Sequence, residues 1–183
     1  FSVSPSGLHS MTMSVDKGVQ FINPYTSDGA YEAFSRSALL VKDNVFECST
    51  VDDGLINPID LNKTMVAARN ANDGRRRTFR LAVGTSVEYT NYHGGTIASA
   101  LAAINVTMTR VNGIYDRELS IRMTLVANNN LLISTTSNSI FPNGEDIASI
   151  TGTINTKIGA STYDIGHTFT TGSGGRAFLA NVC

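Results

Sequence analysis

The feature that most constrains the fold is the stretch from Thr78 to Ala127, which predicts a strand, a polar loop, a long helix and a second strand. Phe79, Leu81 and Val83 alternate with Arg80 and Ala82, as expected for the first strand. Strands that are joined through a helix favour parallel pairing with a right-handed crossover. The stretch therefore predicts part of a parallel sheet that is covered by a helix.

The long helix is predicted by a continuous apolar stripe. Its apolar residues recur at spacings of three and four, at Ile97, Leu101, Ile104, Met108, Val111 and Tyr115. Thr96 follows two glycines and is suited to cap the first turn. The segment Leu119–Ala127 then alternates strictly between apolar and other residues, and it is the clearest predicted strand in the chain.

The remaining elements extend the same architecture. Isoleucines at helical spacing predict a second helix that ends at Gly159: Ile147, Ile150, Ile154 and Ile158. Leu131–Ile133 predicts a short strand, and Ile165–Thr171 another. A glycine-rich loop then leads to a last strand, Arg176–Val182, which favours an antiparallel hairpin. The fold class is α/β, with a mostly parallel sheet and one antiparallel edge strand.

Residues 1–50 are predicted to be β-rich, with a tight turn at Asp16-Lys17-Gly18. After Thr50 the chain becomes rich in Asp, Asn and Arg, and this segment ends in Arg75-Arg76-Arg77. We therefore divide the chain into residues 1–77 and residues 78–183. The basic run fits a solvated linker, a junction that is cut by trypsin-like proteases, or an anion-binding patch.

Composition and motifs exclude several classes of function. The net charge of -1 gives no general attraction to nucleic acid, and no apolar run is long enough to span a membrane. His9, His93 and His167 lack the spacing of a metal-binding helix, and no G-x-S-x-G sequence is present. The abundant Ser, Thr, Asn and Gly are typical of secreted, loop-rich proteins.

Three segments together resemble one protease family: RTFRLAVGTSVEYTNYHGG, ASALAAINVTMTRVNGIYDRELSIRMTLV and YDIGHTFTTGSGGRAFLANVC. The chain is similar to the first part of a reprolysin-like (adamalysin-type) metzincin zinc endopeptidase, most closely the secreted bacterial branch. The resemblance covers Arg77–Cys183, and residues 1–76 look like the end of the family's pro-region. It implies a twisted, mostly parallel sheet whose antiparallel edge strand holds the substrate.

On this resemblance the edge strand is Arg176–Val182. An edge strand offers free backbone groups to which an extended peptide can add as a further strand. The candidate substrate-binding residues are therefore Arg176, Ala177, Phe178 and Leu179. The partners that this implies are a peptide or protein substrate and the remainder of the catalytic domain.

The resemblance also implies zinc, which the family binds through H-E-x-x-H-x-x-G-x-x-H with the Glu as general base. That motif is absent from this sequence, so we expect zinc to be bound by residues of a parent protein and this chain alone to be inactive. Metzincin zymogens often block the zinc with a cysteine of the pro-segment, and Cys48 is the candidate. Cys48 lacks the usual Cys-Gly-Val context, and a bridge to Cys183 or an unrelated thiol is the alternative.

These observations predict a fragment of a secreted zinc endopeptidase precursor, with residues 1–77 as late pro-region and residues 78–183 as the first part of the catalytic domain. The rival interpretation is a non-catalytic, β-rich binding or adhesion module with a metzincin-like fold. A sheet domain that lacks its lower half would leave apolar surface bare. We therefore expect the isolated chain to be marginally stable or to associate.

Overall fold

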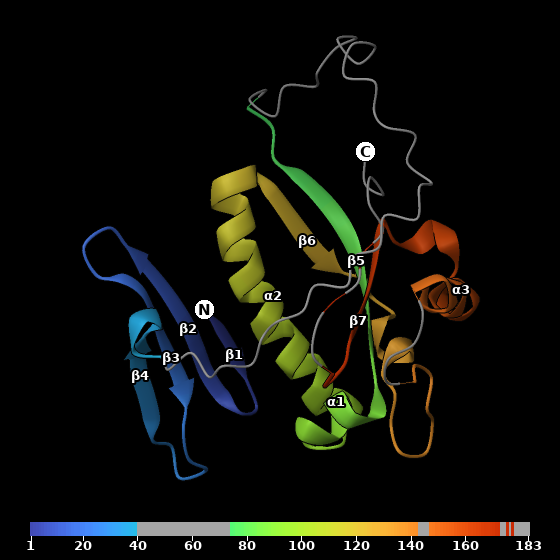
Figure 1. Ribbon diagram of the computed structural model, residues 1–183, viewed down its shortest axis with the longest axis horizontal. Helices are drawn as coiled ribbons and strands as arrows, with labels where there is room; N and C mark the ends of the chain where they lie inside the picture. The colour runs from blue at the N-terminus through green and yellow to red at the C-terminus, as the bar shows by residue number, and fades with distance from the viewer. Residues whose placement is uncertain (40–73, 143–146, 173–174, 176, 178–183) are drawn as a thin grey trace.

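The computed structural model describes residues 1–39, 74–142, 147–172, 175 and 177. Figure 1 shows the long helix α2 (Ile97–Leu119) between two sheets. On one side lies a four-stranded sheet in the order β1-β2-β3-β4, and on the other a three-stranded sheet in the order β6-β5-β7. Helix α3 (Ile147–Ile158) lies beyond the three-stranded sheet. Both sheets therefore lie beside one helix.

The three-stranded sheet is parallel, as the sequence predicts. Its central strand is β5 (Arg77–Thr85), which pairs in parallel with β6 (Ile121–Leu125) and with β7 (Ile165–Phe169). In register, Leu81 lies opposite both Leu125 and Ile165. The predicted antiparallel strand Arg176–Val182 lies outside the described residues, apart from Ala177.

The second half of β5 is buried on both faces. Leu81 and Val83 pack with Ile104 and other residues of α2, whereas Ala82 packs on the opposite face with Phe141 and residues of α3. A strand in the middle of a parallel sheet has both faces covered and reads as a continuous apolar run. This burial explains why the alternation seen at the start of β5 ends after Arg80.

Helix α2 begins where the sequence predicts. The Thr96 hydroxyl accepts a hydrogen bond from the Ser99 backbone N–H at 3.1 Å, and the Ser99 hydroxyl accepts one from the Thr96 N–H at 3.2 Å. These two bonds satisfy N–H groups that the first turn of a helix cannot pair internally. The helix ends at Leu119, and the following cap residue Ser120 has a left-handed φ of 54°.

Two predictions are wrong at the ends of the parallel strands. Leu119 is the last residue of α2 and not the start of a strand, so β6 is shorter than the predicted Leu119–Ala127. The predicted polar loop after β5 contains a short helix, α1 (Val87–Tyr92). The signal for α1 is Ser86, whose hydroxyl accepts from the Tyr89 N–H at 3.3 Å, with Glu88 in the first turn.

The predicted short strand at residues 131–133 is instead a 3-10 turn, η2 (Asn129–Leu132), followed by a single bridge from Ile133 to Thr85. The Asn129 side chain occupies the place of a strand beside β5. Its Oδ1 accepts from the Val83 N–H at 2.7 Å, and its amide donates to the Val83 carbonyl at 3.0 Å. Buried backbone N–H and C=O groups that have no neighbouring strand need other hydrogen-bond partners, and the Asn129 side chain supplies them for Val83.

Helix α3 ends at Gly159, as predicted. Gly159 has a φ of 85° and donates its N–H to the Asn155 carbonyl at 2.9 Å, which is the geometry that favours glycine after a helix. The 3-10 turn η3 (Ala160–Thr162) then leads into β7.

The N-terminal sheet is antiparallel and confirms the predicted β-rich segment. Its strands are β1 (Ser2–Ser4), β2 (Gly7–Ser14), β3 (Gly18–Pro24) and β4 (Tyr31–Ser35), followed by η1 (Arg36–Ala38). The predicted turn joins β2 to β3, where Ser14 pairs with Gly18. Phe21 and Phe34 pack across the next pair of strands, with ring centroids 5.4 Å apart.

The closest packing in the core predicts the effect of one substitution. A Cβ on Gly84 of β5 would lie 2.5 Å from a ring carbon of Phe141, a fully buried side chain. We expect Gly84→Ala to lower the free energy of unfolding by about 1–3 kcal/mol, because overpacking forces the ring out of place. Urea titration measures this value.

The matched control is Gly152→Ala in α3, where a Cβ would meet nothing within 4 Å. Alanine is the better helix former, so we expect this control to be neutral or to stabilise by up to about 1 kcal/mol. Equal losses for the two variants would contradict the packing described for β5.

Candidate functional site

The candidate site lies where the parallel strands β5 and β7 end. Ligands of open α/β sheets bind outside the carboxyl ends of the strands. At this end four rings form an aromatic–histidine cluster: Tyr89, His93, His167 and Phe169. Tyr89 is central, with its ring centroid 5.4 Å from that of Phe169 and 4.6 Å from that of His93. His167 meets Phe169 edge-on at 5.1 Å.

The cluster is positioned by buried hydroxyl groups at the end of β5. Thr85 and Thr90 are both completely buried, and their hydroxyl oxygens lie 2.9 Å apart in a hydrogen bond. This bond ties α1 to the strand that precedes it. The Ser86 N–H donates to the Phe169 carbonyl at 3.0 Å, which extends the pairing of β5 with β7 by one residue. The positions of Tyr89 and Phe169 therefore follow from backbone and hydroxyl pairing.

Burial determines the charge of the cluster. It lowers the pKa of His93 and of His167 and raises the pKa of Tyr89. Burial has this effect because it penalises the charged form of each ring. The His167 residue is nevertheless exposed to solvent, and neighbouring parts of the same chain lower its pKa by partial desolvation of the ring. These directions favour the neutral form of all three rings at pH 7.

The cluster is not a metal centre by itself. Within the described residues, no three His, Cys, Asp or Glu side chains come together in a way that could hold a metal ion. His93 and His167 both contact aromatic rings. The chemistry that these rings support is packing against an apolar or extended ligand.

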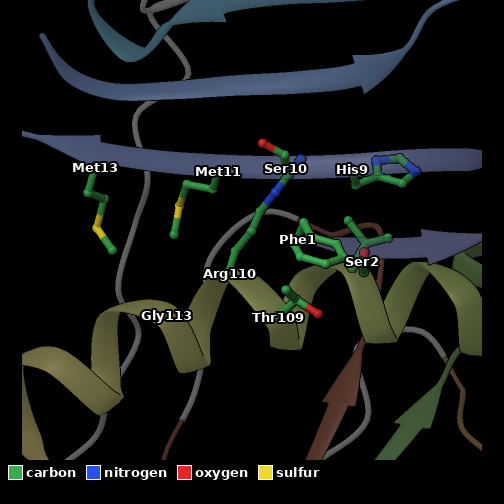
Figure 2. A pocket seen from close by; sticks show the side chains of 10 residues that line it. Phe1, Ser2, His9, Ser10, Met11, Met13, Thr109, Arg110 and Gly113 are labelled. Atoms are coloured by element: carbon green, nitrogen blue, oxygen red, sulfur yellow. The ribbon is translucent and has the colours of Figure 1, made fainter.

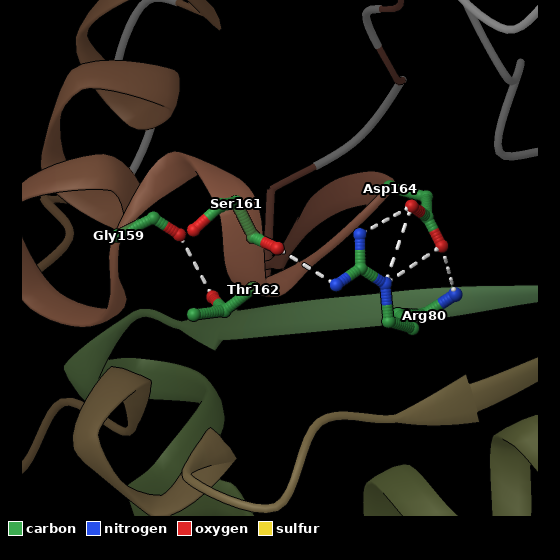
Figure 3. A network of polar contacts seen from close by, with 5 residues as sticks. All are labelled: Arg80, Gly159, Ser161, Thr162 and Asp164. Carbon is green, nitrogen blue, oxygen red and sulfur yellow. Dashed lines mark hydrogen bonds and ion pairs between the residues drawn. The ribbon is translucent and has the colours of Figure 1, made fainter.

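An ion pair at the other end of β7 fixes that strand beside β5, as Figure 3 shows. Arg80 donates through Nη2 to Asp164 Oδ1 at 2.7 Å, and its backbone N–H donates to Asp164 Oδ2 at 2.7 Å. The Asp164 N–H in turn donates to the Arg80 carbonyl at 2.9 Å. Arg80 Nη1 also reaches the Ser161 carbonyl at 2.7 Å. This network sets the register that brings Phe169 beside Tyr89.

The predicted site residues lie apart from the cluster or outside the described residues. Ala177 is exposed and belongs to no helix or strand, while Arg176, Phe178 and Leu179 lie outside the described residues. Cys48 also lies outside them. The substrate-binding and inhibitory roles of these residues stay predictions.

The basic run Arg75–Arg77 lies in the described part of the chain, and its three residues differ in exposure and in secondary structure. Arg75 and Arg76 are exposed and precede β5, whereas Arg77 is the first residue of that strand. The Arg77 N–H donates to the Ser120 carbonyl at 2.9 Å. Arg76 lies 4.0 Å from the Asp116 carboxylate, which also pairs with Arg122. The sheet therefore begins within the basic run.

Sequence analysis missed a second contact face on α2. Two cavities, of about 790 and 90 Å³, lie between α2 and the N-terminal sheet, and both are lined by Val106, Arg110 and His9. Figure 2 shows the smaller cavity, with Arg110 pointing from α2 toward β2. A signal was present in Val106 and Gly113, which are two helical turns apart and lie outside the predicted apolar stripe.

The parallel sheet and the helix that crosses between its strands define an α/β domain. The family model of the reprolysin-like metallopeptidases, family M12B, matches residues 75–183. This match covers more than half of the chain, and the chain belongs to the reprolysin-like metallopeptidase family M12B. No curated protein and no solved structure matches the chain. The predicted resemblance to the reprolysin-like family and the predicted fold class are confirmed, while the assignment to a secreted bacterial branch stays a prediction.

The Arg80–Asp164 network predicts how stability depends on pH. Hydrogen bonds from Arg80 lower the pKa of Asp164 from 3.8 to about 2. A lowered carboxyl pKa stabilises the fold above the unfolded value, and this contribution is lost as the pH falls through the folded value. We expect Asp164→Asn to be less stable than the natural protein at pH 7, and the difference to shrink between pH 4 and pH 2 in urea titrations.

The matched control is Glu118→Gln, because Glu118 pairs with Arg117 on the exposed surface at 2.5 Å. Exposed ion pairs of this kind contribute little to stability. We therefore expect a small change that is nearly independent of pH. A constant difference for Asp164→Asn across the whole pH range would contradict the role given to its charge.

Proposed function

We propose that the chain is part of the precursor of a secreted zinc endopeptidase, with residues 1–77 as the late pro-region and residues 78–183 as the first part of the catalytic domain. The observation that carries this proposal is the position of the family match. It begins at residue 75, two residues before β5, where the chain passes from the antiparallel to the parallel sheet. The family boundary and the structural boundary therefore coincide within the basic run.

The proposed substrate of this peptidase is an extended peptide or protein segment that adds to the predicted edge strand Arg176–Val182, where Arg176, Ala177, Phe178 and Leu179 are the candidate binding residues. Support comes from β7, which has β5 on one side and no described strand on the other. The chain leaves β7 at Phe169 and reaches the exposed Ala177 eight residues later. Unpaired backbone groups of an edge strand bind extended peptides without requiring a particular sequence.

Zinc does not fit the described residues of this chain, since none of their potential ligands come together in threes. The zinc-binding motif is also absent from the 183 residues of the sequence. We therefore assign no catalytic step to this chain. Its proposed role is to supply the sheet, the crossing helix and the strand that aligns the substrate, while the metal is held by other residues of the parent protein.

Processing of the precursor is proposed at Arg75 and Arg76. A protease needs an accessible, extended backbone, and these two residues are exposed ahead of the sheet. Arg77 is held in β5 and is the poorer site. Cys48, which belongs to the segment that such a cut would separate, is the candidate for blocking the zinc. A bridge to Cys183 or an unrelated thiol is the alternative role.

Secretion is inferred from the composition, which is low in charge and rich in Ser, Thr, Asn and Gly. In the part of the chain that the structure describes, no helix combines the length and the apolar character needed to cross a membrane. A second candidate function is a non-catalytic binding or adhesion module. The absence of the zinc motif from this sequence is the observation that favours it.

The proposal predicts that the parent protein carries H-E-x-x-H-x-x-G-x-x-H after Cys183. We expect the purified parent protein to bind one zinc ion per chain and to cleave unfolded protein substrates, as measured by elemental analysis and mass spectrometry of the products. Replacing the Glu of the motif by Gln removes the general base, and we expect a loss of about 100-fold or more in kcat with zinc still bound.

The control is the 183-residue chain, for which we expect no cleavage. A reading frame that lacks the motif, or a parent protein without zinc, would favour the binding module instead. Peptidase activity in the 183-residue chain would contradict the assignment of the metal to other residues.

A further inference from the structure

The second face of α2 is covered by the N-terminal sheet. Val106 is only 8% exposed, yet it belongs to neither of the two apolar clusters that pack on the parallel sheet. It lines both cavities beside the N-terminal sheet, together with Arg110. Val106 is therefore buried by residues of β1 and β2 rather than by the core of the parallel sheet.

Arg110 makes the most specific contacts across this face. Its Cζ lies 5.1 Å from the centroid of the Phe21 ring, and its Nη2 donates to Asn23 Oδ1 at 2.5 Å. Both partners belong to β3, so one guanidinium group binds an aromatic face and an amide oxygen of the same strand. An arginine over an aromatic ring gains stability when the contact excludes water. Arg110 is half-buried, and burial lowers its pKa.

Next to Arg110, cavities interrupt the packing between α2 and the N-terminal sheet. Where α2 passes beneath Met11, a Cβ on Gly113 would lie 3.4 Å from the methionine methyl group, which is ordinary van der Waals contact. The two cavities flank Arg110, and the larger has a volume of about 790 Å³. An interface that is interrupted by cavities is held at few points, and a few central residues carry most of its binding energy.

We propose that the N-terminal sheet is a separable partner of α2 that stays bound after the chain is cut before β5, and that its binding depends on the contact of Arg110 with Phe21 and Asn23. The occupant of this face of α2 is thus the cleaved N-terminal segment of the same chain. The role of this docking in activating a peptidase rests on the proposed function. In a peptidase precursor, removal of the pro-segment requires cleavage and then dissociation from α2.

The test uses the whole chain, with a recognition sequence for a sequence-specific protease inserted between Gly74 and Arg75. The folded protein is cut, and the fraction of complex is measured by native mass spectrometry and size exclusion as the sample is diluted. We expect the two pieces to remain together after the cut. Arg110→Leu is expected to raise the dissociation constant about tenfold or more, because it removes the cation over Phe21 and the donor to Asn23.

The matched control is Arg117→Leu, seven residues later on α2, where the guanidinium is exposed and pairs with Glu118. We expect its dissociation constant to equal that of the natural sequence. Circular dichroism before the cut reports folding of each variant. If Arg110→Leu loses folded structure, Asn23→Ser tests the same contact from the other side, and a weaker complex is again expected.

A double-mutant cycle separates the contact from general weakening of the sheet. Phe21 also packs on Phe34, so Phe21→Leu alone disturbs the N-terminal sheet. We expect Phe21→Leu to weaken binding less in the Arg110→Leu background than in the natural sequence. Pieces that separate at once, an Arg110→Leu complex as tight as the Arg117→Leu control, or strictly additive effects would overturn the proposal.

This experiment measures the binding of the cleaved N-terminal segment to the rest of the chain and does not depend on peptidase activity. A missing zinc motif in the parent protein would therefore refute the proposed function and leave the docking result intact. Conversely, an active zinc peptidase whose cut pieces separate at once would refute only the docking of the N-terminal sheet on α2.

Discussion

The fold depends on the burial of β5 between two layers. Leu81 and Val83 face α2, while Ala82 faces α3 and Phe141, so one short strand supplies both apolar clusters. This arrangement leaves no room at Gly84 for a side chain and requires Asn129 to complete the hydrogen bonds of Val83. Pairing with β5 also fixes the end of β7, where Phe169 of the aromatic–histidine cluster lies opposite Thr85. The parallel sheet, its two helices and the candidate site thus have a common centre.

Helix α2 is the element that connects this core to the rest of the chain. The middle of its apolar stripe faces the parallel sheet, and Val106, Arg110 and Gly113 line a cavity against the N-terminal sheet. The two contacts differ in kind, because the first is a continuous apolar core and the second is interrupted by cavities. On the proposed function, the loosely covered face of α2 is the one that cleavage of the precursor would expose. The family match, which includes α2 and begins at residue 75, agrees with this division.

The sequence predicts the elements with strong periodicity and misses those that depend on tertiary contacts. The cap at Thr96 and the stop at Gly159 are local signals, and both are confirmed in the structure. The predicted apolar stripe is confirmed in its middle, where Leu101, Ile104, Met108 and Val111 pack in the core, whereas Ile97 and Tyr115 at its ends are exposed. Helix α1 was missed because it is six residues long and is held by the Thr85–Thr90 bond. The role of Arg110 could not be predicted, since Phe21 and Asn23 are distant in sequence. The cluster around Tyr89 also depends on the pairing of β5 with β7.

Amide hydrogen exchange tests the central position of β5 most directly. Amides exchange slowly where opening requires unfolding of the whole core and faster in units that open alone. The account predicts that the N–H groups of Leu81, Val83 and Thr85 are among the slowest in the chain, and that those of β2 and β3 exchange faster through separate opening of the N-terminal sheet. Equal protection in the two sheets, or slower exchange in β2 and β3, would contradict a core that is built on β5 with a separable N-terminal sheet.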